Sequence, residues 1–162
     1  YISGVQKRDA GQETGLVRGL QSTDSNDFSF MYLQIPSIGL AEEVERDRDS
    51  LSRQGLTHMR YSGYPRNNSS NVVIVGHSID YGRYIPPPFF YLSRVEEGDE
   101  IYLKYKGVQY VYEVVRNSVV ESSEVGIEAT ISGKALITLY TCYPIFNPIY
   151  RYVVVGELVS IR

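Results

Sequence analysis

The feature that most constrains the fold is a series of short runs rich in β-branched and aromatic residues, bounded by turn residues. The clearest runs are residues 72–75, 135–140 and 152–159. Such residues favour strands, and runs this short lack the length and the 3.6-residue period of a helix. With weaker runs at 99–104 and 108–121, the sequence predicts about seven or eight strands, a number typical of a β-barrel or β-sandwich.

The segments between these runs carry the turn residues of a β-rich chain. Lys106-Gly107 divides two of the runs and predicts a hairpin. Residues 42–52 are mostly charged and residues 59–71 are mostly polar, so both are expected to be surface connections. Residues 122–134 predict a long loop that holds a short helix, and loops of this length in compact domains are often functional.

Length and composition indicate one folded domain and exclude some classes of partner. The 162 residues and the apolar fraction of 43% suit a single hydrophobic core, which we place in residues 31–162. The apolar residues in 1–30 follow neither the two-residue period of a strand nor the 3.6-residue period of a helix, so this segment is predicted to be a mobile N-terminal appendage. The net charge of −3 provides no basic surface for nucleic acid or for an anionic membrane. Neither is an expected partner.

The single cysteine, Cys142, cannot form a disulfide within the chain. It follows a predicted buried strand and precedes Tyr143-Pro144, so it is expected at a rigid strand end. A lone cysteine of this kind is either a buried structural residue or a nucleophile. Nucleophilic thiol chemistry also needs a proton carrier and a group that stabilises the developing oxyanion.

His77 and Arg151 are the candidates for those two roles. His77 ends the run 72–75 and is flanked by Gly76 and Ser78, whereas His58 lies in a polar stretch that no predicted strand presents to a site. Arg151 comes nine residues after Cys142 and opens the last strand. If the two strands are neighbours, the guanidinium lies near the sulfur. A core-packed or solvated histidine and a surface arginine remain the alternatives.

Four stretches of the sequence together resemble the sortase family. They are Thr138-Leu139-Tyr140-Thr141-Cys142, Val75-Gly76-His77-Ser78, Arg151 followed by Tyr-Val-Val-Val, and the opening pattern at residues 33–40. The resemblance covers residues 31–162. It implies an all-β fold, a closed eight-stranded barrel with short helices in the connecting loops.

The resemblance also implies a cysteine transpeptidase in which Cys142 is the nucleophile, His77 the acid and base, and Arg151 the oxyanion stabiliser. The substrate would be a sorting-signal peptide of the Leu-Pro-x-Thr-Gly kind, cleaved after Thr. The acyl group would pass to an amine of a lipid-linked peptidoglycan precursor or of a pilin Lys. Substrate contacts are expected from Ser78, Thr141 and three apolar residues of the long loop, which are Val125, Ile127 and Ile131.

Family membership implies a location on the outer face of the cytoplasmic membrane, with an N-terminal transmembrane anchor that the given residues do not include. The nine-residue step from Cys142 to Arg151 is closer to pilin-type (class C) or class E-like branches than to branches with a longer insertion. Asp27-Phe28 weakly resembles the lid motif of pilin-type members. No cofactor is predicted. Calcium would need converging oxygen ligands, and the acidic runs are more typical of solvated faces.

Two other functions remain open from the sequence. L,D-transpeptidases of peptidoglycan are also β-rich cysteine enzymes, but they typically carry Ser-His-Gly-Cys at the nucleophile, where this chain has Leu-Tyr-Thr-Cys. A non-catalytic β-barrel binding module would make Cys142 a thiol of ordinary reactivity.

Overall fold

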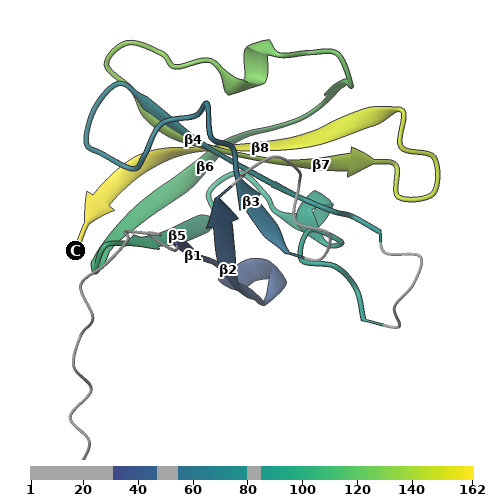
Figure 1. The fold of residues 1–162 in the computed structure, drawn as a ribbon, viewed down its shortest axis with the longest axis horizontal. Coiled ribbons are helices and arrows are strands. Elements are labelled where there is room, and N and C mark those ends of the chain that lie inside the picture. The colour runs from purple at the N-terminus through teal and green to yellow at the C-terminus, as the bar shows by residue number, and fades with distance from the viewer. Residues whose placement is uncertain (1–30, 47–54, 80–84) are drawn as a thin grey trace, which may run out of the picture.

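The computed structural model describes residues 31–46, 55–79 and 85–162, and within them eight strands close into a barrel (Figure 1). Around the barrel the order is β1, β2, β3, β4, β7, β8, β6, β5. The strands are β1 (Met31–Ile35), β2 (Leu40–Arg46), β3 (Leu56–His58), β4 (Ser70–Gly76), β5 (Glu100–Tyr105), β6 (Val108–Glu121), β7 (Ala135–Tyr143) and β8 (Tyr150–Ile161). The predicted closed eight-stranded all-β barrel is confirmed. The predicted N-terminal appendage and lid motif lie outside the described residues.

Two of the eight pairings are parallel, those of β2 with β3 and of β4 with β7. The others are antiparallel. Parallel strands run in the same direction, so the ends of β4 and β7 lie at the same edge of the barrel. The edge where both strands end carries the candidate site.

The barrel is filled by one apolar core, with a smaller cluster on the outside of the wall. Along β7, Ile137 and Leu139 point inward to the core, while Leu136 belongs to the outer cluster with Val153 and Val155 of β8. This is the period-two alternation of a strand. Residues 135–139 of β7 are nevertheless buried on both faces, because part of the segment between β6 and β7 packs on the outer side.

Short connections join the strands as the turn residues predicted. Lys106-Gly107 turns the β5–β6 hairpin, with both residues at positive φ. The described helices are single 3-10 turns, η1 (Pro36–Ile38), η2 (Leu92–Arg94) and η3 (Gly126–Glu128). The last lies in the predicted loop 122–134 and confirms a short helix there.

Two predicted surface connections are corrected by the structure. Residues 42–46 belong to β2, whose outer side chains are exposed, so its charged residues suit a one-sided strand. Ser70 and Asn71 begin β4 and are buried, at 0% and 1% exposed. Their polar groups are satisfied by hydrogen bonds, which is the condition for burying such residues.

His58 is a further correction, because it does lie on a strand. It ends β3 at 2% exposed and pairs with Arg46 of β2 and Ile74 of β4. Its Nε2 lies 3.0 Å from the carbonyl oxygen of Gly63, and its ring contacts that of Tyr64. The sequence did not predict a strand here, because the three residues of β3 are too few to show a period. His58 is therefore part of the packed interior.

Candidate active site

Cys142 and Arg151 lie directly opposite one another in the antiparallel ladder between β7 and β8. Opposite residues in such a ladder present their side chains on the same face, with Cβ atoms about 4.5–5.5 Å apart. Both residues are partly exposed, and Cys142 is a free thiol. The structure therefore places the two residues side by side on neighbouring strands, and the pairing of these strands on which the prediction depended is present.

His77 immediately follows β4, and two side-chain hydrogen bonds fix its place beside the end of β7. The regular ladder ends where Val75 pairs with Tyr140. Beyond it, the Thr141 hydroxyl donates to the carbonyl oxygen of Gly76 at 2.7 Å. The Ser78 hydroxyl donates to the carbonyl oxygen of Cys142 at 2.8 Å. These bonds continue the pairing by two residues and bring the chain at His77 alongside Cys142.

Ser78 and Thr141 thus hold the two strand ends together. Both are buried, at 2% and 4% exposed. Their hydroxyl groups donate to backbone carbonyls, so the geometry lends no support to the predicted contact of these two hydroxyls with substrate. What they fix is the backbone on either side of His77 and Cys142.

Cys142 and Arg151 face the outside of the barrel. In β7, Leu136, Tyr140 and Cys142 share one face by alternation, and the first two pack in the outer apolar cluster. Val120 of β6 lies opposite Arg151 and belongs to the same cluster. The strand residues of this cluster that remain partly exposed are Val120 and Tyr140, since Leu136, Val153 and Val155 are buried at 5%, 0% and 5% exposed. Val120 and Tyr140 therefore form the outer surface of the wall beside Cys142 and Arg151.

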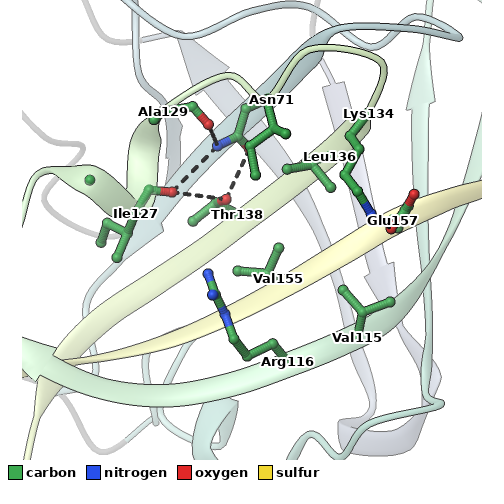
Figure 2. A pocket seen from close by; sticks show the side chains of 12 residues that line it. Asn71, Val115, Arg116, Ile127, Ala129, Lys134, Leu136, Thr138, Val155 and Glu157 are labelled. Carbon is green, nitrogen blue, oxygen red and sulfur yellow. Dashed lines mark hydrogen bonds and ion pairs between the residues drawn. The ribbon is translucent and has the colours of Figure 1, made fainter.

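Further along this face, a pocket of about 280 Å³ opens between the wall and the loop 122–134 (Figure 2). Leu136, Thr138 and Val155 form its floor, and Ile127 and Ile131 of the loop form its side. Two of the three loop residues predicted to contact substrate thus line a pocket. Val125 does not line it, and its side chain is 75% exposed.

The loop is fastened to the wall by side chains that the sequence analysis did not single out. Asn71 donates from Nδ2 to the carbonyl oxygens of Ile127 and Ala129, at 3.4 and 3.1 Å. Its Oδ1 accepts from the Thr138 hydroxyl at 2.9 Å. Figure 2 shows these bonds beneath the loop. Asn71 ends a polar run and Thr138 lies within an apolar one. Only the tertiary structure shows that their side chains form a hydrogen bond.

Glu128 fixes the same loop from its other side. Its Oε1 accepts hydrogen bonds from the hydroxyls of Tyr61, at 2.7 Å, and Tyr140, at 2.6 Å. Burial and the contact with the Glu128 carboxylate raise the pKa of Tyr140 well above its ordinary value, so this hydroxyl remains a donor at physiological pH. Tyr140 is two residues before Cys142 and links the loop to the strand that carries the nucleophile.

Two further observations concern metals and membranes. Among residues 31–46, 55–79 and 85–162, no three His, Cys, Asp or Glu side chains are grouped closely enough to hold a metal ion. No helix in those same ranges has the length and apolar character needed to cross a bilayer.

Comparison with known proteins agrees with this arrangement. A family model described as the sortase domain matches residues 33–159. The chain belongs to the sortase family. It is 28% identical to Sortase D of Bacillus subtilis over 133 residues, which make up 79% of the chain and 63% of that relative. This sortase chain spans less than two thirds of the length of each curated relative that it matches.

Solved sortase structures share its barrel. A lid mutant of sortase A from Corynebacterium diphtheriae superposes with a TM-score of 0.75 at 28% identity, covering 81% of this sortase and 70% of that chain. Sortase C-1 from Actinomyces oris gives 0.71 at 28% identity, covering 80% and 73%. Neither an L,D-transpeptidase nor a non-catalytic binding module finds support in these comparisons.

Proposed function

We propose that this sortase is a cysteine transpeptidase that cleaves a sorting-signal peptide of the Leu-Pro-x-Thr-Gly kind after Thr and transfers the acyl group to an amine. The observation that carries the proposal is the pairing of Cys142 with Arg151 across β7 and β8, beside the β4 end that bears His77. A thiol, an imidazole and a guanidinium at one edge are the groups that acyl transfer through a thioester requires.

In the proposed reaction the Cys142 thiolate attacks the backbone carbonyl carbon of the Thr in the sorting signal. The carbonyl π electrons move to oxygen, and the Arg151 guanidinium donates hydrogen bonds to this oxyanion. Collapse of the tetrahedral intermediate breaks the C–N bond, and His77 as imidazolium gives its proton to the departing amine. A thioester on Cys142 and a neutral imidazole result.

The second half of the proposed reaction reverses the direction of proton transfer at His77. An acceptor amine attacks the thioester carbonyl, and the neutral His77 imidazole takes the proton that the nitrogen loses. Expulsion of the thiolate leaves a new amide bond and restores the starting protonation states. The acceptor is an amine of a lipid-linked peptidoglycan precursor or of a pilin Lys, and its choice separates wall anchoring from pilus assembly.

The proposed site of action is the outer face of the cytoplasmic membrane, reached through an N-terminal anchor that precedes the residues given. The proposal includes no cofactor. The loop that walls the pocket is already held by Asn71 and Glu128 through hydrogen bonds, which is consistent with a loop that needs no metal ion to order it.

Covalent capture tests the proposal. The protein is incubated with a Leu-Pro-x-Thr-Gly peptide and, separately, with a methyl-thiosulfonate, and intact mass spectrometry locates adducts. We expect a thioester adduct and a mixed disulfide, both on Cys142 and both absent from Cys142→Ala. If the thiosulfonate labels Cys142 and no sorting-signal peptide in a varied set forms an acyl-enzyme, the transpeptidase proposal fails.

A further inference from the structure

A β-bulge in β6 turns a charged side chain toward the pocket on the outer wall. Val114 pairs with Gly156 and Arg116 pairs with Val155, so Val115 is an extra residue in the ladder. Without it, Arg116 would share the face of Val114, which points into the core. With it, Val115 and Arg116 both line the pocket. Bulges of this kind re-aim side chains and are frequent beside functional sites.

Arg116 is the charged side chain of this pocket for which the described residues provide no partner. The pocket's other two charged side chains, Lys134 and Glu157, form an ion pair at 2.7 Å. Among the described residues, no hydrogen bond or ion pair involves the Arg116 side chain. Figure 2 shows it rising from β6 past Val155 toward Thr138. The polar groups of Thr138 and Asn71 are already bonded to one another and to the loop.

The pocket's distance from the nucleophile suits one stretch of a bound peptide. Thr138 lies four residues before Cys142 on the same face of β7, which corresponds to about 13 Å along a strand. Arg116 lies in the same row, across Val155. A peptide extended along this wall with its scissile carbonyl at Cys142 would bring about its fourth residue from that carbonyl to the pocket.

We propose that Arg116 recognises an acidic side chain at the fifth residue before the scissile bond, the residue that precedes the Leu of the sorting signal. The apolar floor and loop would take one apolar side chain, and the guanidinium would bind the carboxylate of a neighbouring residue. A planar guanidinium binds a carboxylate with two parallel hydrogen bonds, which a lysine cannot reproduce. This inference rests on the proposed transpeptidase function and assigns the class of peptide it prefers.

The test measures acyl-enzyme formation and kcat/KM for peptides of the Leu-Pro-x-Thr-Gly kind that carry Glu, Gln or Lys at the position before Leu. We expect Glu to exceed Gln by roughly fivefold to tenfold, in line with a hydrogen-bonded charge pair at a partly exposed site. Arg116→Gln should remove this preference. Arg116→Glu should reverse it, so that the Lys peptide becomes the better substrate. Arg162→Gln, at an exposed arginine outside the pocket, is the matched control and should keep the wild-type order.

The outcomes separate this inference from the proposed function. If wild-type protein turns over the Gln and Glu peptides equally, and Arg116→Glu gains nothing toward Lys, the recognition of an acidic residue is wrong while the transpeptidase stands. If no peptide acylates Cys142, the proposed function itself fails. Arg116 is exposed and has no partner among the described residues. Its variants are therefore expected to have the same urea midpoint of unfolding as the wild-type protein, which a urea titration checks.

Discussion

Cys142 and Arg151 occupy a directly opposed pair of positions in one β-ladder. The spacing of their backbones is therefore set by strand pairing and not by a flexible loop. The backbone of β8 holds Arg151 in place, and its Nη1 also donates to the carbonyl oxygen of Tyr150 at 3.1 Å. A site built on paired strands is held more precisely than one built on loops.

The first prediction concerns the shape of the cation at position 151. Arg151→Lys keeps the positive charge but loses the planar array of donors, so the oxyanion loses hydrogen bonds. We expect kcat/KM to fall by roughly 100-fold, the typical loss for one oxyanion donor, with the thermal midpoint nearly unchanged. Arg162→Lys, at an exposed arginine past the end of β8, is the control. An Arg151→Lys variant with wild-type kcat/KM would remove Arg151 from the mechanism.

The second prediction concerns the glycine before His77. A Cβ at Gly76 would lie 2.7 Å from Cδ2 of Leu56 and 2.8 Å from Cδ2 of Phe89, and both of these side chains are fully buried. Gly76→Ala should therefore destabilise the fold by about 1–3 kcal/mol through overpacking. It should also displace His77 and lower kcat. Urea unfolding measures the first effect, and Gly63→Ala, where the nearest atom to a Cβ is the carbonyl oxygen of Asn71 at 3.5 Å, controls for a glycine replaced without overpacking.

The third prediction concerns the bonds that Glu128 accepts. Tyr61→Phe removes one hydroxyl at an exposed position, and Glu128→Gln replaces the carboxylate by a weaker acceptor. Each should loosen the loop that walls the pocket and raise KM about threefold to tenfold while kcat changes less, because one hydrogen bond contributes about 1 kcal/mol. Since both variants break the same contact, their combined effect should be smaller than the product of the two. Strict multiplication would show that Tyr61 and Glu128 act independently.

The fourth prediction concerns pH. Burial lowers the folded-state pKa of His58 below its ordinary 6.5, with a smaller contribution from Arg46 in the same direction and an opposing one from the hydrogen bond to Gly63. The unfolded chain then binds more protons than the folded chain as the pH falls through 6.5, so stability rises with pH in this window and is lost on acidification.

Urea titrations between pH 7.5 and 5.5 should show the free energy of unfolding decrease, while the ring resonances of His58 in the folded state titrate below pH 6.5. His77→Asn, which removes the other histidine, should retain the same decrease. A His58 ring that titrates at or above pH 6.5 in the folded protein would contradict the prediction.

The strands β4, β7 and β8 and the pairing of Cys142 with Arg151 were predictable because each depends on local pattern. Continuous β-branched runs placed β4, β7 and β8, and the nine-residue step brought Arg151 back to Cys142. His58, Asn71 and Arg116 were missed for physical reasons that the sequence does not display. A three-residue strand is too short for a period, a buried amide depends on partners more than 50 residues away, and a bulge changes which face a residue occupies.

The residues predicted to touch substrate show the same division. Ile127 and Ile131 were chosen for apolar character in a long loop, and the pocket includes both. Ser78 and Thr141 were chosen because they adjoin the reactive residues, and their hydroxyls instead join β4 to β7. Proximity in sequence to His77 or Cys142 indicates that a residue lies near the candidate site. The direction of its hydroxyl depends on which backbone carbonyl lies opposite on the neighbouring strand.

The parallel pairing of β4 with β7 has a consequence for when the thiol can become reactive. The two strands are separated by more than 50 residues of chain. Contacts of such long range form late in folding, because the entropy of closing the intervening loop must be overcome first. A partly folded chain in which β4 and β8 have not yet paired with β7 therefore lacks the arrangement of His77, Cys142 and Arg151 that the proposed acyl transfer requires.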